Sequence, residues 1–174
     1  MRRLLSSVAL FSAGTIAGMF LMHSGLVPQA HAQSNVAQQN LPGIRLNHVG
    51  VYVKDWNESW DFYTKTMGFK EAFTNKDKDG KPTLSYLQIN KDTFLELAPA
   101  TAERPAGLSH LGIWADDLNA TVATLRMRGA KVADPRSASS KSPLTNIIDP
   151  NGVRVELLEF PAESLQRKAM DTWK

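Results

Sequence analysis

The sequence predicts an α+β protein built from two tandem βαβββ modules. The main observation is an internal repeat, in which residues 46–55 recur as residues 108–117. Leucine, histidine, glycine and a terminal aspartate are identical in the two copies, and the aliphatic and aromatic positions match in kind. The closing segments 94–97 and 154–157 are also similar, and each carries a glutamate. Because self-similarity at a fixed period indicates a duplicated structural unit, we expect two modules, at 44–100 and 107–160.

Each module predicts the same order of elements. The repeat is an apolar strand that ends at an aspartate, and Asp55 and Asp117 are good N-caps for a following helix. Gly68 and Gly129 are good helix stops, since glycine adopts the left-handed conformation at little cost. Three strands then complete each module. The predicted helices are 55–67 and 117–128, and the predicted strands are 46–53, 70–74, 83–89, 93–98, 108–115, 131–133, 144–149 and 153–160. Residues 161–174 are expected to form a peripheral terminal helix.

The first 32 residues resemble a signal peptide. Arg2 and Arg3 form a basic start, residues 4–22 are apolar and uncharged, and Ala30-His31-Ala32 places small residues where signal peptidase requires them. We expect cleavage after Ala32, a polar linker over 33–43, and export to the periplasm or the medium. The alternative is an uncleaved anchor, because the apolar run is about long enough to span a bilayer.

Composition excludes several classes of protein. Without the leader the chain carries 18 basic and 17 acidic residues, a balance that predicts neither a nucleic-acid partner nor stable membrane association. The chain has no cysteine, which removes disulfides, thiolate metal sites and cysteine nucleophiles. We therefore expect a small molecule as the partner.

Two histidines and two glutamates occupy matched positions in the modules. His48 and His110 are the only histidines outside the leader, and Glu96 and Glu156 lie on the matched closing strands. Side chains alternate across a strand, so all four point away from the faces that pack on the helices. A carboxylate within an apolar strand is costly to bury unless it is paired. Convergence on one divalent ion would satisfy all four.

Such a set of two nitrogen and two oxygen ligands suits Ni, Co, Zn, Mn or Fe. Tyr52, Trp114 and Arg154 share the same faces and are expected to line the pocket; ordinary packing for the two aromatic residues and a solvated salt bridge for Arg154 are the alternatives. Gly50 and Gly112 fit a close approach across the sheet or simple bulges.

The motifs at 46–55, 94–97, 108–117 and 149–157 resemble those of the vicinal oxygen chelate superfamily, and the resemblance covers residues 44–160. It implies a cupped, barrel-like mixed sheet with the helices outside and one metal ion inside. The set His48, Glu96, His110 and Glu156 is similar to the ligands of glyoxalase I. In that family the metal holds two neighbouring substrate oxygens, and the resemblance implies that Glu156 is the base and Glu96 its partner.

Two positions differ from glyoxalase I. Tyr52 stands where that enzyme has an arginine that helps to hold glutathione, and Leu97-Ala98-Pro99-Ala100 replaces a segment with an asparagine. We therefore expect a lyase or isomerase that acts on a small carbonyl compound by removing an adjacent proton, rather than a glutathione-dependent enzyme.

Three alternatives remain open from the sequence. An extradiol-type dioxygenase would use His48, His110 and Glu156 as a facial triad. A binding or resistance protein would hold a small molecule without turnover. The modules of one chain can form the site, or two chains can exchange modules in a homodimer.

Overall fold

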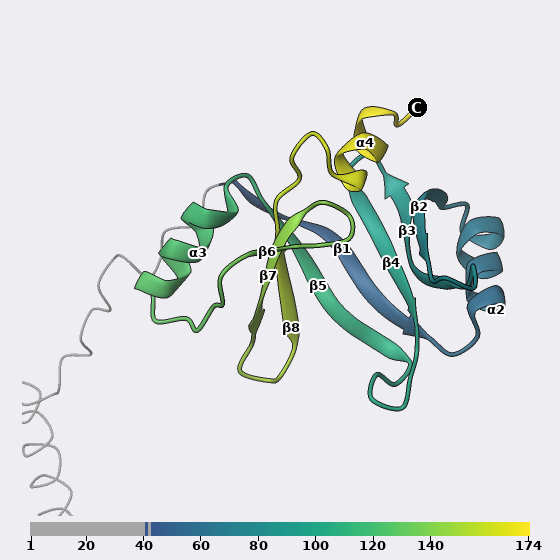
Figure 1. Cartoon of the computed structure of the whole chain (residues 1–174), viewed down its shortest axis with the longest axis horizontal. Coiled ribbons are helices and arrows are strands. Elements are labelled where there is room, and N and C mark those ends of the chain that lie inside the picture. Colours follow the sequence, from purple (N-terminus) through teal and green to yellow (C-terminus); the bar gives the residue numbers. More distant parts are fainter. Residues whose placement is uncertain (1–40, 42) are drawn as a thin grey trace, which may run out of the picture. The chain divides into compact units, whose positions relative to one another are not determined.

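The fold is an open, eight-stranded mixed sheet with helices packed against it (Figure 1). The structure, a computed structural model, describes residue 41 and residues 43–174. The predicted signal peptide and most of the predicted linker lie outside these residues. Within the described part, no helix has the length and apolarity needed to cross a membrane.

The two predicted modules form the two halves of the sheet. The strands are β1 (Ile44–Val53), β2 (Lys70–Lys76), β3 (Pro82–Asn90), β4 (Thr93–Pro99), β5 (Gly107–Ala115), β6 (Arg136–Ser137), β7 (Pro143–Ile148) and β8 (Arg154–Leu158). Their order is β2-β3-β4-β1-β5-β8-β7-β6. In each half the first strand pairs in parallel with the closing strand, and the halves join through the antiparallel pair β1–β5. This confirms the predicted α+β fold of two modules.

The sheet does not close into a barrel. Strands β2 and β6 are its edges, and each pairs with a single neighbour, β3 and β7 respectively. The site is therefore formed by one face of an open sheet.

The first helices of both modules begin at the predicted caps. The Asp55 side chain accepts a hydrogen bond from the Glu58 amide at 2.9 Å, and the Asp117 side chain accepts one from the Ala120 amide at 2.8 Å. Helix α3 (Leu118–Met127) is a regular α-helix, whereas α2 (Trp56–Asp61) continues as a π-helix, η2 (Phe62–Thr66).

Each helix covers an apolar cluster on its own half of the sheet. Val53 packs with the buried leucines of β3 and β4 beneath Trp56 and Trp60. Ala115 and Leu157 pack in the same way beneath α3. The predicted division of each strand into a helix-facing side and an opposite side is therefore confirmed.

The strand predicted at 131–133 is absent. Val132 is buried beneath α3, and its carbonyl accepts hydrogen bonds from the Arg126 side chain rather than from a neighbouring strand. Pro135, three residues after Val132, has no amide hydrogen, and the short strand β6 begins only after it. The strand prediction was wrong because Val132 is buried by packing beneath α3 and not by pairing with a neighbouring strand.

The C-terminal helix α4 (Leu165–Asp171) is not peripheral. Met170 packs in a cluster that joins both modules, with Tyr86 and Phe94 from one half and Trp114 and Leu158 from the other. This cluster lies on the face of the sheet opposite α2 and α3, so α4 fixes the two halves to each other on the side of the site.

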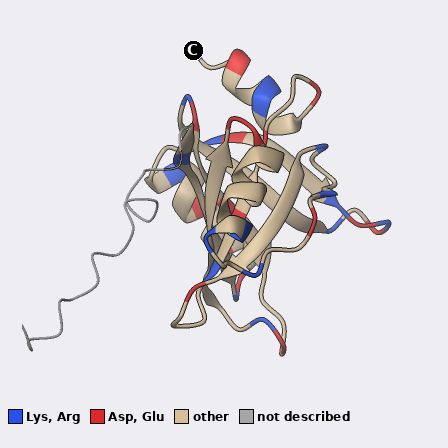
Figure 2. Cartoon of the chain, turned by 90° about the vertical axis from the view of Figure 1, so that its left-hand side faces the viewer, with Lys and Arg blue, Asp and Glu red and all other residues tan. Residues whose placement is uncertain are grey.

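Charged residues are distributed without a dominant sign in the view of Figure 2. Lys and Arg segments alternate with Asp and Glu segments over the loops and helices, while most strand surface is uncharged. This distribution agrees with the nearly balanced charge of residues 33–174.

Candidate metal centre

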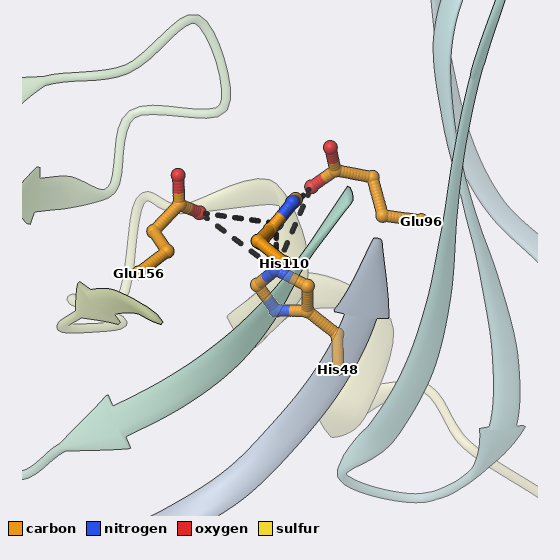
Figure 3. A group of neighbouring side chains, drawn as sticks. All are labelled: His48, Glu96, His110 and Glu156. Atoms are coloured by element: carbon orange, nitrogen blue, oxygen red, sulfur yellow. Dashed lines mark hydrogen bonds and ion pairs between the residues drawn. The ribbon is translucent and has the colours of Figure 1, made fainter. Parts of the chain in front are cut away.

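The four residues predicted as ligands meet at one point within a single chain. One nitrogen or oxygen of each of His48, Glu96, His110 and Glu156 lies within 4.8 Å of the other three ligand atoms. They come from the four central strands, β1, β4, β5 and β8. Figure 3 shows the two glutamates on opposite sides of the histidine pair. Both modules of one chain supply the site, so the predicted homodimer is not needed to assemble it.

The two histidine rings are in close contact, and each glutamate lies near both. The Nε2 atoms of His48 and His110 are 2.9 Å apart. Glu96 Oε2 is 3.6 Å from each Nε2, and Glu156 Oε1 is 3.7 Å from that of His48 and 4.0 Å from that of His110. All four residues are buried, with exposed fractions from 0% for His48 to 9% for Glu96.

Glycine makes this approach of the histidines sterically feasible. In the β1–β5 register, Gly50 lies opposite His110 and Gly112 lies opposite His48. A Cβ at Gly50 would lie 2.1 Å from the His110 ring, and one at Gly112 would lie 2.0 Å from the His48 ring. Each module thus leaves space for the histidine of the other, which confirms the predicted close approach.

The ring of His48 is held in an orientation that leaves its Nε2 free to bind a metal. Its Nδ1 lies 3.1 Å from Asn47 Oδ1, and the Asn47 amide nitrogen donates to the Asp92 carbonyl at 2.7 Å. Because an amide oxygen only accepts, Nδ1 of His48 carries the proton and Nε2 presents a lone pair.

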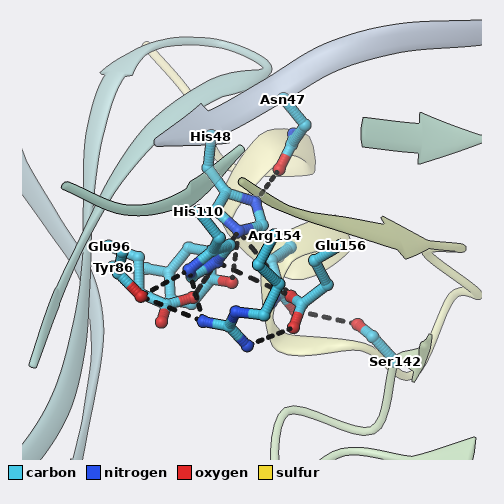
Figure 4. A network of polar contacts seen from close by, with 10 residues as sticks. Asn47, His48, Tyr86, Glu96, His110, Ser142, Arg154 and Glu156 are labelled. Carbon is cyan, nitrogen blue, oxygen red and sulfur yellow. Dashed lines mark hydrogen bonds and ion pairs between the residues drawn. The ribbon is translucent and has the colours of Figure 1, made fainter. Parts of the chain in front are cut away.

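The neighbours of His110 differ from those of His48. Arg154 Nη2 lies 2.7 Å from His110 Nδ1 (Figure 4), and the Ser109 hydroxyl lies 3.0 Å from the same atom. A guanidinium only donates, so this contact places the His110 proton on Nε2, from which it can donate to His48. A metal on Nε2 requires the other tautomer, and Ser109 is placed to accept the Nδ1 proton of that form.

The donor set fits a divalent ion. Ligand atoms about 2.1 Å from one ion lie about 3.0 Å apart at right angles and about 4.2 Å apart in opposite positions. The separations from 2.9 to 4.0 Å between the histidine nitrogens and their neighbours agree with that range. Two imidazoles and two carboxylates suit borderline divalent cations and leave positions open for water or substrate.

Burial and neighbouring charges separate the protonation behaviour of the two glutamates. Burial alone would raise the pKa of Glu96, but its interaction with His110 and the positive charge that His48 carries when protonated bring this pKa below its ordinary value. Burial and the negative charge of Glu96 raise the pKa of Glu156. Burial lowers the pKa of His48 to about 4, against the opposing effect of Glu96, so this ring is neutral near pH 7.

A cavity of about 250 Å³ lies over the two glutamates. Tyr52 and Arg154 line it, as expected from their strand faces. Trp114 does not line it. Its ring packs in the core against Phe160, and the Arg45 guanidinium lies 3.6 Å from the ring centroid on another side. A hollow of similar size between α2 and β2 contains none of the four ligands, so the site is assigned to the cavity that does.

Some site residues were not predicted from the sequence. The Tyr86 hydroxyl lies 3.4 Å from His48 Nε2, and burial together with the two glutamates raises its pKa well above the ordinary value, so the phenol stays protonated. Strand alternation could have found it, because Tyr86 is the register partner of Glu96 on β3. Arg104 and Arg136, by contrast, reach the cavity from a loop and a two-residue strand that carry no such pattern.

The fold and site define the class of protein. Residues 45–157 match the Glyoxalase/Bleomycin resistance protein/Dioxygenase superfamily, and the chain belongs to this family. This confirms the resemblance seen in the repeated motifs.

Individual relatives include lyases and epimerases. A probable lactoylglutathione lyase from Vibrio cholerae is 28% identical over 125 residues, which cover 66% of this chain and 90% of the relative. The lactoylglutathione lyase of Escherichia coli O157:H7 is 27% identical, with 67% and 93% coverage. A variant methylmalonyl-CoA epimerase of Streptomyces coelicolor, solved with 2-nitronate-propionyl-CoA, has a TM-score of 0.58 and 27% identity over 69% of this chain and 96% of its own. The epimerase of Mycobacterium tuberculosis shares the fold, with a TM-score of 0.59, 22% identity and coverage of 71% and 94%.

Proposed function

We propose that this protein is a metal-dependent lyase or isomerase that moves a proton next to a carbonyl group of a small substrate. The observation that carries the proposal is the convergence of His48, Glu96, His110 and Glu156 beneath a cavity in a single chain. The named activities of the relatives, lactoylglutathione lyase and methylmalonyl-CoA epimerase, support a lyase or isomerase.

The residues of the site would have separate roles in metal binding, proton transfer and exclusion of water. The two histidines and two glutamates would hold one divalent ion, which when bound would polarise the substrate oxygens. Glu156, whose carboxylate faces the cavity, would take the proton, and Glu96 would act from the opposite side of the site. The Tyr86 hydroxyl, protonated and fixed beside His48, would hold the ligand arrangement in place. Leu84, Leu144 and Leu158 would exclude water from the cavity wall.

The test measures metal content and proton exchange together. The chain without its leader is purified without tags or chelators, loaded with Ni, Co, Zn or Mn, and incubated in D₂O with a panel of small 2-oxo and 2-hydroxy compounds. We expect one ion per chain and metal-dependent deuterium incorporation next to a carbonyl. Glu156→Gln should lower the exchange rate by about 10²- to 10⁴-fold.

Glu163→Gln is the matched control, because this glutamate is exposed and lies outside the cavity. It should exchange at the wild-type rate. Absence of bound metal, or exchange that is unchanged in Glu156→Gln, would refute the proposal. Metal-dependent oxygen consumption without exchange would instead indicate a dioxygenase.

We also propose that the protein is exported after cleavage behind Ala32. The basic pair Arg2-Arg3, the apolar segment 4–22 and the Ala30-His31-Ala32 site support this. N-terminal sequencing of the protein from a periplasmic or extracellular fraction should begin at Gln33. An intact N-terminus in the membrane fraction would favour the uncleaved anchor.

A further inference from the structure

Three arginines from three separate elements line the cavity above the metal centre. Arg104 belongs to the segment between β4 and β5, Arg136 begins β6, and Arg154 begins β8. The only acidic residues among the cavity-lining residues are the two glutamates of the metal centre. A bound divalent ion would balance these two charges, which leaves the arginines as the uncompensated charge of the cavity.

The three guanidinium groups have N–H donors that are available to a ligand. Arg154 uses Nη2 for Ser109, at 2.9 Å, and for His110, while its Nη1 lies 3.9 Å from Glu156, beyond hydrogen-bonding distance. Among the described residues, no carboxylate forms an ion pair with Arg104 or Arg136 within 4.0 Å. The Arg104 guanidinium instead lies over the Tyr52 ring, 5.4 Å from its centroid, which holds it beside the cavity.

We propose that the cavity selects a compact substrate that carries an oxyanion, a carboxylate or phosphonate, beside its chelating oxygens. This substrate class rests on the proposed function. Guanidinium groups bind carboxylates and phosphonates in a planar, two-point geometry, and three of them around one small cavity favour an anion over a neutral compound. The volume of about 250 Å³ is at the small end for ligand sites, so the enclosed part of the substrate is compact. Arg154 and Arg136 hold the anion, and Arg104 attracts it at the entrance.

The placement of Arg154 and Arg136 supports this assignment. Arg154 Nη1 lies 3.9 Å from Glu156 Oε2, and Arg136 lines the same cavity as Glu156. An oxyanion bound between them would lie on the same side of the cavity as the proposed base.

The experiment compares probes that chelate a metal identically and differ only in charge. Butanohydroxamate has a terminal methyl group; succinic acid monohydroxamate and 3-phosphonopropanohydroxamate carry a carboxylate or a phosphonate at the other end. Affinities for the metal-loaded protein are measured by titration calorimetry. We expect at least one anionic probe to bind about tenfold or more tightly than the neutral one, as charge-assisted hydrogen bonds predict. The stronger of the two anionic probes identifies the oxyanion.

Arg136→Gln should abolish most of that preference. It should change the affinity for butanohydroxamate by less than about twofold, because among the described residues no ion pair or hydrogen bond joins Arg136 to a candidate metal ligand. Arg126→Gln removes the same charge from α3, away from the cavity, and should leave the preference intact. Equal affinity for charged and neutral probes, or a preference unaffected by Arg136→Gln, would overturn the proposal.

Failure of metal binding can be distinguished from failure of anion binding. If the protein holds no metal, inorganic phosphate and succinate are titrated directly into the full mature chain. Binding that is lost in Arg136→Gln would support the anion site without the metal chemistry, and no binding of either ion would overturn the anion site.

Discussion

The two modules supply the same ligands from the same positions, yet they surround them differently. Each contributes one histidine and one glutamate, and each has a glycine that accommodates the histidine of the other. The flanking elements have diverged. Strand β2 has seven residues and β6 has two, and the first helix contains a π-helical segment in module one only.

The environments of the ligands have diverged as well. His48 is oriented by a buried amide, Asn47, whereas His110 contacts a hydroxyl and a guanidinium. The pKa of Glu96 is lowered and that of Glu156 is raised. The repeat therefore places the candidate metal ligands, and neighbours that are not repeated shift the pKa values of the two glutamates in opposite directions.

The largest effect should come from removing a ligand from either module. His48→Ala and His110→Ala should each lower the affinity for a divalent ion by more than about 100-fold. This loss exceeds the one typical of residues that only hydrogen-bond to a metal ligand. Both should also abolish the rise in melting temperature that metal produces in the unchanged protein. Titration calorimetry and thermal unfolding measure the two effects. Retention of one ion per chain in either variant would contradict a shared site.

The next effect concerns α4, which has no counterpart in module one. Met170 is 3% exposed in the cluster that joins the modules, so Met170→Ala should lower the free energy of unfolding by about 2–4 kcal/mol. Met127→Ala is the matched control, because Met127 is 81% exposed at the end of α3 and should change stability by less than about 0.5 kcal/mol. Denaturant unfolding distinguishes them, and equal stability of the two variants would show that α4 is peripheral after all.

A smaller effect is expected at the paired glycines. Gly50→Ala and Gly112→Ala should each destabilise the protein by about 1–3 kcal/mol, because the added methyl group displaces a histidine ring. The affinity of both variants for a divalent ion should also fall. Gly129→Ala introduces the same methyl group into open space, at a left-handed position that costs about 1 kcal/mol, and should leave metal affinity unchanged. Equal metal affinity in all three variants would disprove the role of the close approach.

The smallest effect should distinguish the two histidine supports. Asn47→Ala should lower metal affinity by about tenfold or more, since the buried Asn47 amide orients the His48 ring. Ser109→Ala should cost less, because Ser109 is only partly buried and water can replace its hydroxyl as acceptor for the Nδ1 proton of His110. Asn47→Asp keeps the oxygen that accepts from His48 but loses the donor to the Asp92 carbonyl, so it should recover only part of the loss. Titration with a divalent ion measures the affinity of each variant. A larger loss of affinity in Ser109→Ala than in Asn47→Ala would contradict this prediction.

Local signals predicted most of the secondary structure. The helix caps Asp55 and Asp117 bind the amides expected of them, and the glycines at 68 and 129 have the positive φ angles that end a helix. The strand predicted at 131–133 was wrong because Val132 is buried by contact with α3 rather than by pairing. Apolar periodicity reports burial, and it does not distinguish a paired strand from a buried loop.

Tertiary contacts corrected the assignments that depended on distant partners. Trp114 lies on the strand face predicted for it, but Phe160, which follows β8, packs against it in the core. Helix α4 is too short for its apolar pattern to indicate burial, and its partners come from both modules. Neither contact has a signal in the local sequence.

The order of the residues alone was enough to predict the duplicated fold, the faces of the strands and the four candidate ligands, because an internal repeat and strand alternation are both visible in the sequence. Only the tertiary structure decided that one chain completes the site, that the sheet stays open, and that three arginines meet over the ligands. The tertiary structure also lowers the pKa of Glu96 and raises that of Glu156, because a pKa depends on burial and on charges brought together from distant parts of the chain.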